Sequence, residues 1–327
     1  MAGVGPCALI TGVTGQDGSY LAEVLLARGY RVVGTTRSKQ KALTSPIGPI
    51  ASRISLVEDD CSDDRDVRAL VQRFAPDEIS NLAARASSAD LFSDPAVTGD
   101  INGLLSARLL EAVRLERPAS RFFQALSSEL YGTPEAGMQS ESTLFSPGNP
   151  YAVAKLYAYW MVKVYRERYG LHASSGILFN HESPRRALHF VTRKISRAAA
   201  MASMGDSSPL ELGSLDARRD WSFAGDFAEA MRLMVAAERP DDYVLASGVS
   251  HSVADFCELA YRRVGLDYRD HVRSVPGLTR VADNSTRVGD ASKARRELGW
   301  QARVEFKGLV HMMVDADVEH LKAGEGI

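Results

Sequence analysis

Three closely spaced glycines, Gly12, Gly15 and Gly18, stand between a short apolar run and a segment with helical spacing. Glycines at such a turn let the backbone approach a pyrophosphate closely, and the amino terminus of the following helix then faces the negative charge. A second β-rich run, residues 31–36, follows at the distance that a dinucleotide-binding βαβ unit requires. We therefore expect the turn to bind a dinucleotide through Gly12, Thr14, Gly15, Gln16, Asp17 and Gly18.

The first 180 residues alternate between short β-rich runs and stretches with helical spacing. We expect strands at 7–10, 31–36, 54–57, 78–82, 122–126 and 173–179. We expect helices at 20–28, 63–74, 101–115 and 151–169, and around 190–204, 225–237, 252–264 and 306–322. Such alternation is typical of a parallel sheet with helices on both faces. The prediction is an α/β fold: a Rossmann-type doubly wound parallel sheet with a smaller, interleaved C-terminal α/β substrate domain.

Two further expectations concern packing. Residues 38–51 contain Pro46, Gly48 and Pro49, and we interpret this segment as a surface loop. Trp160, Met201 and Met204 lie on helical stretches, where large apolar side chains usually belong to the core.

Composition excludes several classes of protein. The 327 residues carry 39 basic and 41 acidic side chains, so no basic excess indicates nucleic-acid binding. The chain contains no apolar run of about 18 residues, and so we expect no membrane partner. The three cysteines are far apart and no cysteine–histidine cluster has metal spacing, which predicts free thiols and no metal site. The first residues lack the basic region of a signal peptide, and we expect a cytoplasmic protein.

The end of the second strand indicates which dinucleotide binds. An NAD site usually has an acidic residue there, whereas this chain has Arg37 followed by Lys39, which suit a 2′-phosphate. We therefore expect NADP rather than NAD. Asp60 and Cys61 end the third strand, where an acid can meet the adenine, although Asp59 is an alternative. After the fourth strand we also assign Leu82, Ala83 and Ala84 to the cofactor site.

The candidate catalytic residues follow the fifth strand and begin a long helix. Tyr151 and Lys155 are four residues apart and share a helix face, so the ammonium group should favour the phenolate and lower the tyrosine pKa. Such a pair can exchange a proton with an alcohol oxygen while hydride moves to or from nicotinamide. Ser127 can hold the same oxygen, and Glu129 can remove a proton next to the resulting ketone. The alternative for Glu129 is a capping or salt-bridged carboxylate.

These motifs resemble the extended short-chain dehydrogenase/reductase superfamily and, within it, the GDP-mannose 4,6-dehydratase family. The resemblance covers nearly the whole chain. It rests on residues 8–21, 128–132, 150–157, 176–184, 190–194, 219–221 and 298–300.

The resemblance implies a reaction and a role for each matching residue. NADP takes hydride from C4 of a nucleotide sugar, C5 loses a proton, water leaves from C6, and the hydride returns to C6. Tyr151 is the implied C4 base with Lys155 as its partner, Glu129 the C5 base, and Ser127 the hydroxyl group at a position where the family usually has threonine. His181 and Arg186 are further implied cofactor contacts. The implied substrate contacts are Ser127, Ser128, Glu129, Asn180, Val191, Lys194, Leu212, Gly213, Arg219, Arg280 and Asp283.

The resemblance also predicts the domain division and the assembly. Residues 1–180, with about 222–248, should form the NADP-binding domain, and 181–221 with 249–327 the sugar-nucleotide-binding domain. Helices near 98–115 and 150–168 should pair two subunits as a four-helix interface. We expect a homodimer, with a homotetramer as the alternative.

Three departures from the family pattern leave the substrate open. Residues 84–90 introduce Arg85 and Asp90, which could pair with each other or meet a different ligand group, residues 280–285 lose a proline and a glutamate, and a double arginine is reduced to Arg37 and Ser38. Drift within a GDP-mannose enzyme, a changed nucleotide sugar, or loss of dehydration would each produce them. The remaining alternatives are a 4-reductase, an epimerase or a decarboxylating relative, and a non-catalytic protein that binds NADP or a nucleotide sugar.

Overall fold

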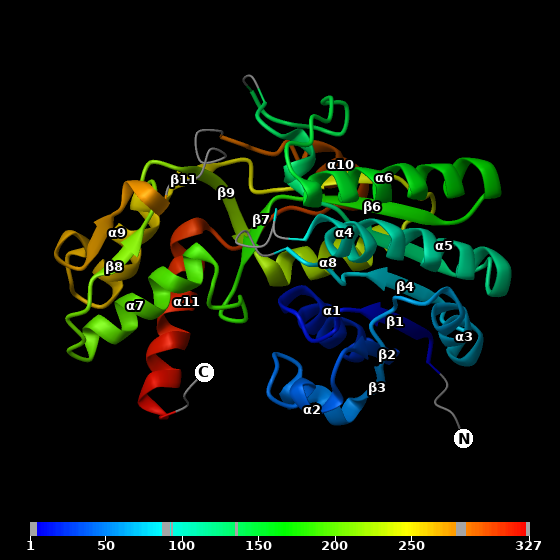
Figure 1. Cartoon of the computed structure of the whole chain (residues 1–327), viewed down its shortest axis with the longest axis horizontal. Helices are drawn as coiled ribbons and strands as arrows, with labels where there is room; N and C mark the ends of the chain where they lie inside the picture. Colours follow the sequence, from blue (N-terminus) through cyan, green and yellow to red (C-terminus); the bar gives the residue numbers. More distant parts are fainter. Residues whose placement is uncertain (1–4, 87–91, 93, 135–136, 279–285, 325–327) are drawn as a thin grey trace.

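A seven-stranded parallel sheet forms the centre of the molecule (Figure 1). The structure is a computed structural model that describes residues 5–86, 92, 94–134, 137–278 and 286–324. The sheet has the order β10-β6-β5-β4-β1-β2-β3. Its strands are β1 (Cys7–Thr11), β2 (Arg31–Thr36), β3 (Ile54–Glu58), β4 (Glu78–Asn81), β5 (Arg121–Ala125), β6 (Ala173–Leu178) and β10 (Asp242–Leu245). The predicted α/β fold is confirmed.

Strand β1 lies at the point where the strand order reverses, with β2 on one side and β4 on the other. In open parallel sheets, ligands bind outside the carboxyl ends of the strands at such a switch point. Successive residues of β1 point to opposite faces, and both faces are apolar because both are covered by helices. Ala8 and Ile10 belong to one core, and Cys7 and Leu9 to the other.

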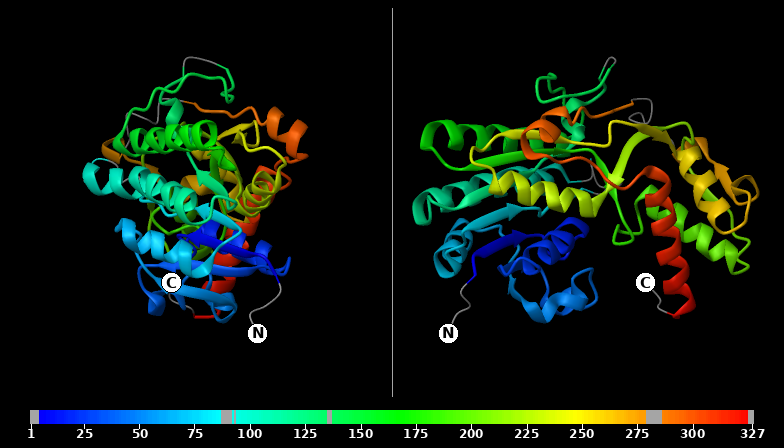
Figure 2. Two further views of the ribbon diagram at one scale, coloured as in Figure 1. Left: turned by 90° about the vertical axis from the view of Figure 1, so that its right-hand side faces the viewer. Right: turned by 180° about the vertical axis from the view of Figure 1, so that it is seen from behind.

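Helices cover both faces of the sheet (Figure 2). The first core packs against α1 (Gln16–Leu26), α8 (Ala224–Ala236) and α10 (Ser292–Leu298). The second packs against α3 (Asp64–Phe74), α5 (Leu105–Glu116) and α6 (Pro150–Tyr169). Before α5 come α4 (Pro95–Gly99) and a π-helical turn, η2 (Asp100–Leu104), which together contact α6.

A second group of elements lies beyond the carboxyl edge of the large sheet (Figure 1). The strands β7 (Asn180–Glu182), β9 (Arg218–Phe223) and β11 (Ser250–Ser252) form one small sheet, and β8 (Leu210–Leu212) pairs with β12 (Val272–Ser274). These strands pack against α7 (Val191–Ser203), α9 (Val253–Arg263) and α11 (Phe306–Lys322). A separate hydrophobic core, centred on residues such as Phe256 and Met313, holds these helices together.

Two packing expectations are wrong. Residues 38–51 contain a short helix, α2 (Lys39–Ala42), and the start of a 3₁₀ helix, η1 (Gly48–Arg53). Ala42 and Ile47 in this segment are buried in the first core, because the segment covers the end of the sheet next to β3. Trp160, Met201 and Met204 are 51%, 36% and 46% exposed. Helical spacing located these side chains on helices but could not show which face is covered.

Two further expectations concern the cysteines and membrane-spanning helices. Cys7, Cys61 and Cys257 are free and buried. Among the helices of the described ranges, none combines the length and the apolar character that crossing a membrane would need.

The buried carboxylate of Asp220 connects three separate parts of the chain. Asp220 lies in β9 and accepts hydrogen bonds from the backbone amides of Ser247 (2.9 Å), Gly248 (2.9 Å) and Gly289 (3.2 Å). The Ser247 hydroxyl group also donates to it. The small three-stranded sheet is thereby tied to the loop after β10 and to the segment that follows residue 286.

We predict that Asp220→Ala destabilises the protein. Four donors would lose their acceptor in a buried setting, and the expected loss is about 3 kcal/mol of the free energy of unfolding. Urea denaturation followed by circular dichroism measures it. Asp216→Ala, at an exposed aspartate four residues earlier, is the control and should change stability by less than about 0.5 kcal/mol. Equal stability of both variants would show that the carboxylate does not organise these segments.

Candidate functional site

The glycine-rich turn packs closely against the end of β4. Gly12 has a φ of +68°, and a Cβ atom there would lie 2.8 Å from the Cα of Ala83. The Thr11 hydroxyl group donates to Asn81 (2.6 Å) and accepts from the backbone amides of Leu82 and Ala83, both at 3.1 Å. Of the three residues predicted after β4, Leu82 and Ala83 therefore lie beside the turn, while Ala84 is exposed.

The amino terminus of α1 is open to an anion. Its N-cap residue is Gly15, which provides no side-chain hydrogen bond to the first turn of this eleven-residue helix. Gly18 is required for the close approach, because a Cβ atom there would lie 2.5 Å from the carbonyl oxygen of Gly12. Thr14 lies in the same turn and is half-buried. These features fit the pyrophosphate of a dinucleotide.

Three predicted cofactor contacts, Gln16, Asp17 and His181, also bind one another. The Gln16 side chain donates to the carbonyl oxygen of His181 (3.0 Å) and accepts from Ser183 (2.7 Å). The His181 ring donates through Nε2 to Asp17 (2.9 Å) and through Nδ1 to the carbonyl oxygen of Phe179 (2.7 Å). These contacts join α1 to β7.

Asp17 and His181 shift each other's pKa. Burial raises the pKa of Asp17, but the charge and hydrogen bond of His181 outweigh burial and lower it to about 2. Burial lowers the pKa of His181, and the Asp17 carboxylate more than compensates, so that this pKa is raised. Each shift favours the charged form of its group.

The residues at the ends of β2 and β3 have unequal exposure. Arg37 and Asp60 are exposed, and hydrogen bonds from Ser62 lower the pKa of Asp60, with a smaller effect from the charge of Arg37. Cys61 is buried with a φ of 61°, and burial raises the pKa of its thiol to about 12. Its amide donates to Asp59 at 2.6 Å.

Tyr151 and Lys155 lie in the first turns of α6, and both are buried. The Lys155 ammonium group donates to the carbonyl oxygen of Ala125 at 2.8 Å and lies 5.8 Å from the centre of the Tyr151 ring. Burial lowers the pKa of Lys155 to about 8, against the opposing charge of Asp17. The lysine is thus held against the end of β5, beside the tyrosine.

The expected lowering of the Tyr151 pKa is wrong for this structure. Burial raises that pKa to about 12, although a hydrogen bond with Ser127 acts in the opposite direction. The Glu129 carboxylate adds to the rise, and the Arg186 guanidinium group opposes it. The cost of burying a phenolate therefore exceeds the effect of the surrounding cations. The same interactions show that Ser127, Glu129 and Arg186 all lie near the tyrosine.

Glu129 is salt-bridged, as the alternative interpretation of this residue expected. Its carboxylate pairs with Arg287 and accepts a hydrogen bond from the Asn149 side chain at 3.1 Å. Asn149 is also the N-cap of α6, since its Oδ1 accepts from the amide of Ala152 at 2.9 Å. An asparagine before a proline is a helix-start signal that could have identified Asn149. No local pattern distinguishes Arg287.

The residues assigned to the substrate lie on several elements. Asn180 is in β7, and Val191 and Lys194 are in the first turn of α7. Leu212 ends β8, Gly213 follows it, and Arg219 is in β9. Ser128 is buried in the turn after β5. Arg280, Asp283 and Asp90 lie outside the described residues.

Two arginines near this region form ion pairs. Arg186 pairs with Glu182 at 3.1 Å and lies over the ring of Phe190. Arg85 pairs with Asp94 at 3.7 Å. A pair between Arg85 and Asp90 stays a prediction, because Asp90 lies outside the described residues.

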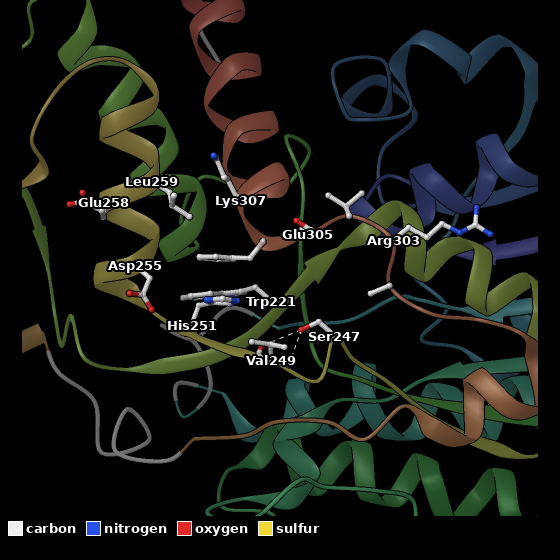
Figure 3. A pocket seen from close by; sticks show the side chains of 13 residues that line it. Trp221, Ser247, Val249, His251, Asp255, Glu258, Leu259, Arg303, Glu305 and Lys307 are labelled. Atoms are coloured by element: carbon white, nitrogen blue, oxygen red, sulfur yellow. Dashed lines mark hydrogen bonds between the residues drawn. The ribbon is translucent and has the colours of Figure 1, made fainter.

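A cavity of about 630 Å³ lies apart from these residues, between β9, α9 and the start of α11 (Figure 3). Trp221, Phe306 and His251 form a stack along it, with ring centres 5.9 Å and 3.8 Å apart. None of the predicted site residues lines it. Within the described ranges, no group of three or more acidic, histidine or cysteine residues is arranged to hold a metal ion.

Comparison with known proteins agrees with the motifs and the fold. The family model "GDP-mannose 4,6 dehydratase" matches residues 9–313. GDP-mannose 4,6 dehydratase 1 of Arabidopsis thaliana is 45% identical, over 96% of this chain and 90% of that protein. GDP-mannose 4,6-dehydratase of Sinorhizobium fredii is 42% identical, over 96% and 97%.

Solved structures with low sequence identity share the fold. UDP-glucose 4-epimerase from Thermotoga maritima superposes with a TM-score of 0.86 at 20% identity, covering 96% of this chain and 99% of that one. dTDP-glucose 4,6-dehydratase from Bacillus anthracis has a TM-score of 0.85 at 19% identity, covering 97% and 98%. The resemblance seen in the sequence is therefore confirmed, and this chain belongs to the GDP-mannose 4,6-dehydratase family.

Proposed function

We propose that this protein converts GDP-mannose to GDP-4-keto-6-deoxymannose with NADP as its cofactor. The family membership supports the substrate. The observation that carries the reaction type is the position of Glu129: a carboxylate beside Tyr151 and Ser127 can remove the proton next to a ketone made at C4. An enzyme that only oxidises or reduces C4 has no use for this carboxylate.

The glycine-rich turn and the uncapped amino terminus of α1 fit the cofactor pyrophosphate. Arg37, exposed at the end of β2, would bind the 2′-phosphate of NADP, and Asp60 and Cys61 would lie near the adenine. Leu82, Ala83 and Ala84 would line the site beside the turn. When bound, the nicotinamide supplies the acceptor for the C4 hydride and the donor that returns it to C6.

The remaining chemistry consists of proton transfers by the chain. Ser127 holds the C4 oxygen, and Tyr151 takes the C4 hydroxyl proton. This step requires the phenolate form of Tyr151, which the ammonium group of Lys155, 5.8 Å from the ring centre, favours. Glu129 then takes the proton from C5, which the neighbouring ketone acidifies. The same carboxyl group gives a proton to the C6 hydroxyl group, and the C6–O bond breaks to release water. When the hydride returns to C6, C5 takes up a proton, so that the product gains no net electrons and no net oxidation or reduction results.

The substrate would bind between the carboxyl edge of the large sheet and the second group of elements. We assign its contacts to Ser128, Asn180, Val191, Lys194, Leu212, Gly213 and Arg219, and to Arg280 and Asp283. Arginine and lysine suit the two phosphates of a nucleoside diphosphate. We retain the division into 1–180 with 222–248, and 181–221 with 249–327, as a proposal. The separate hydrophobic cores support it except at α10, which lies within 249–327 but packs in the first core.

We also propose that two copies of the chain pair through α6 and its neighbours. Val153, Tyr157, Trp160 and Val164 are 41–54% exposed and form one stripe along α6. Leu104 of η2, which packs beside α6, is 45% exposed. A second copy would bury this apolar face and create a four-helix interface.

Mass spectrometry of GDP-mannose incubated with the protein and NADP tests the function. We expect the loss of one water without net formation of reduced cofactor. An unchanged mass would favour an epimerase or a binding protein, and consumption of reduced cofactor would favour a reductase.

Glu129→Gln should block the loss of water, while Tyr151→Phe should already prevent oxidation at C4. Glutamine cannot accept the C5 proton, and we expect a decrease on the order of 10³-fold in dehydration from removing the base. Incubation in deuterated water should then show no exchange at C5 in Glu129→Gln. Normal turnover of this variant would contradict its assignment as the base.

Arg37→Asp should reverse the cofactor preference. A charge-assisted contact to phosphate would be lost, which corresponds to weaker NADP binding by roughly 10- to 100-fold, while NAD binding should improve. Isothermal titration calorimetry with both dinucleotides measures this. Arg53→Asp, at an exposed arginine before β3 and thus at the opposite edge of the sheet, is the matched control. Unchanged NADP affinity in Arg37→Asp would remove Arg37 from the site.

Introducing charge into the α6 stripe should separate the subunits. We expect light scattering to give a dimer for the natural protein and a monomer for Trp160→Glu/Val164→Glu, because two carboxylates would have to be buried at the interface. Arg168→Glu, near the exposed end of the same helix, should remain a dimer. A natural protein that is monomeric at micromolar concentration would contradict the pairing.

A further inference from the structure

A segment distant in the sequence is held across the candidate active site. Gln139 pairs with residues 288–290 through backbone hydrogen bonds of 2.8 Å on both sides. The Gln139 side chain accepts from the amide of Val288 at 2.9 Å, and Asp220 accepts from the amide of Gly289 at 3.2 Å. A Cβ atom at Gly289 would lie 2.3 Å from the Ala246 side chain, so the segment is packed tightly. These contacts therefore restrict the movement of residues 288–290.

Arg287 lies within this segment and is buried, with only 3% of the residue exposed. One guanidinium nitrogen pairs with Glu129, and the other donates to the carbonyl oxygen of Gly132 at 2.7 Å. Gly132 has a φ of +59°, and a Cβ atom there would collide with the carbonyl oxygen of Ser146. The turn that contains Glu129 is thus shaped to present both acceptors to a single arginine. The buried Nε of Arg287 has no hydrogen-bond partner among the described residues.

Stability alone does not explain this arrangement. Burying an arginine costs desolvation free energy, and a buried ion pair often gives no net stabilisation compared with apolar side chains. Here the cost is greater because one donor stays unpaired. Glu129 is the more exposed partner, with 28% of its side chain accessible compared with 4% for Arg287. The arginine therefore supports the carboxylate from the buried side.

We propose that Arg287 is a positioning residue that, together with Asn149, holds the Glu129 carboxylate in place for elimination. The proposal rests on the proposed function of Glu129 as the C5 base. Arg287 and Asn149 contact different carboxylate oxygens, so both rotation and displacement of the group are restricted. Because Asn149 also caps α6, the carboxylate is fixed relative to Tyr151 two residues later.

The ion pair acts on both proton transfers. The carboxylate that takes the C5 proton is the one that Arg287 and Asn149 hold in place. Once Glu129 carries that proton, the arginine has lost its partner charge, and this favours transfer of the proton to the departing C6 hydroxyl group. The C5–H and C6–O bonds break, a C5–C6 double bond forms, and water is released. Arg287 itself exchanges no proton.

Arg287→Met tests the proposal, because methionine fills similar space without a charge. In single-turnover experiments we expect C4 oxidation at a near-normal rate. Deuterium exchange at C5 and the loss of water should each slow on the order of 10²-fold, the cost of a misplaced catalytic group. Arg287→Lys should recover part of this loss, since lysine restores the charge but not both contacts.

Two comparisons separate positioning from a general structural role. In a Glu129→Gln background, Arg287→Met should cause no further decrease, because its effect passes through Glu129. Arg166→Met is the matched control: Arg166 is a largely buried arginine paired with Asp242 near the other end of α6. It should lower thermal stability without separating C4 oxidation from elimination.

The outcomes distinguish the two proposals. If the natural protein eliminates water and Arg287→Met does so at the same rate, the positioning role is wrong and the proposed function stands. If Arg287→Met slows C4 oxidation as much as elimination, the arginine is only structural. If the natural protein fails to dehydrate GDP-mannose while binding it, the proposed function fails, and the role of Arg287 fails with it.

Discussion

The carboxylate of Asp220 is the contact on which the assembly of the site depends. The carboxyl edge of the parallel sheet provides the cofactor turn, Ser127 and Tyr151, but it does not by itself bring in the second group of elements. Asp220 joins β9 of the small sheet to the loop after β10 and to the segment around Gly289. Burial raises its pKa, and the hydrogen bonds from the loop and from the segment around Gly289 oppose that rise. An isolated buried carboxylate would be costly, so the three segments stabilise one another through it.

Burial acts on four titratable groups of the site, but their pKa values do not all shift toward the neutral form. Asp17 and His181 form a hydrogen-bonded pair that joins α1 to β7, and the pKa of Asp17 falls to about 2. Lys155 and Tyr151 are also buried, yet the pKa of Lys155 falls to about 8 and that of Tyr151 rises to about 12. Both shifts disfavour the charged form, because neither group has a fully compensating partner of opposite charge. Tyr151 and Lys155 therefore lie in surroundings of low dielectric constant, where a new charge nearby changes their pKa values strongly.

Much of the architecture could be predicted from periodicity and turn residues. The second strand and the last helix were predicted with the bounds observed, Arg31–Thr36 and Phe306–Lys322. The glycine-rich turn and the helix that begins near Tyr151 also lie where expected. The prediction of a surface loop at residues 38–51 is wrong because prolines and glycines indicate turns but do not reveal burial. The prediction that Trp160 belongs to the core is wrong because the apolar stripe of α6 on which it lies faces outward.

The sequence by itself determined the α/β alternation and the glycine-rich turn, and it identified the residues proposed for proton transfer, since each depends on neighbours within a few positions. Only the tertiary structure decided the pKa values and the ion-pair partners of these residues. The Tyr151 pKa depends on how completely the folded chain removes water from the phenol. The partner of Glu129 is Arg287, 158 residues away, and no local pattern could select it among the other arginines. Long-range packing sets burial and pairing, and these two properties decide the charge and direction of each catalytic group.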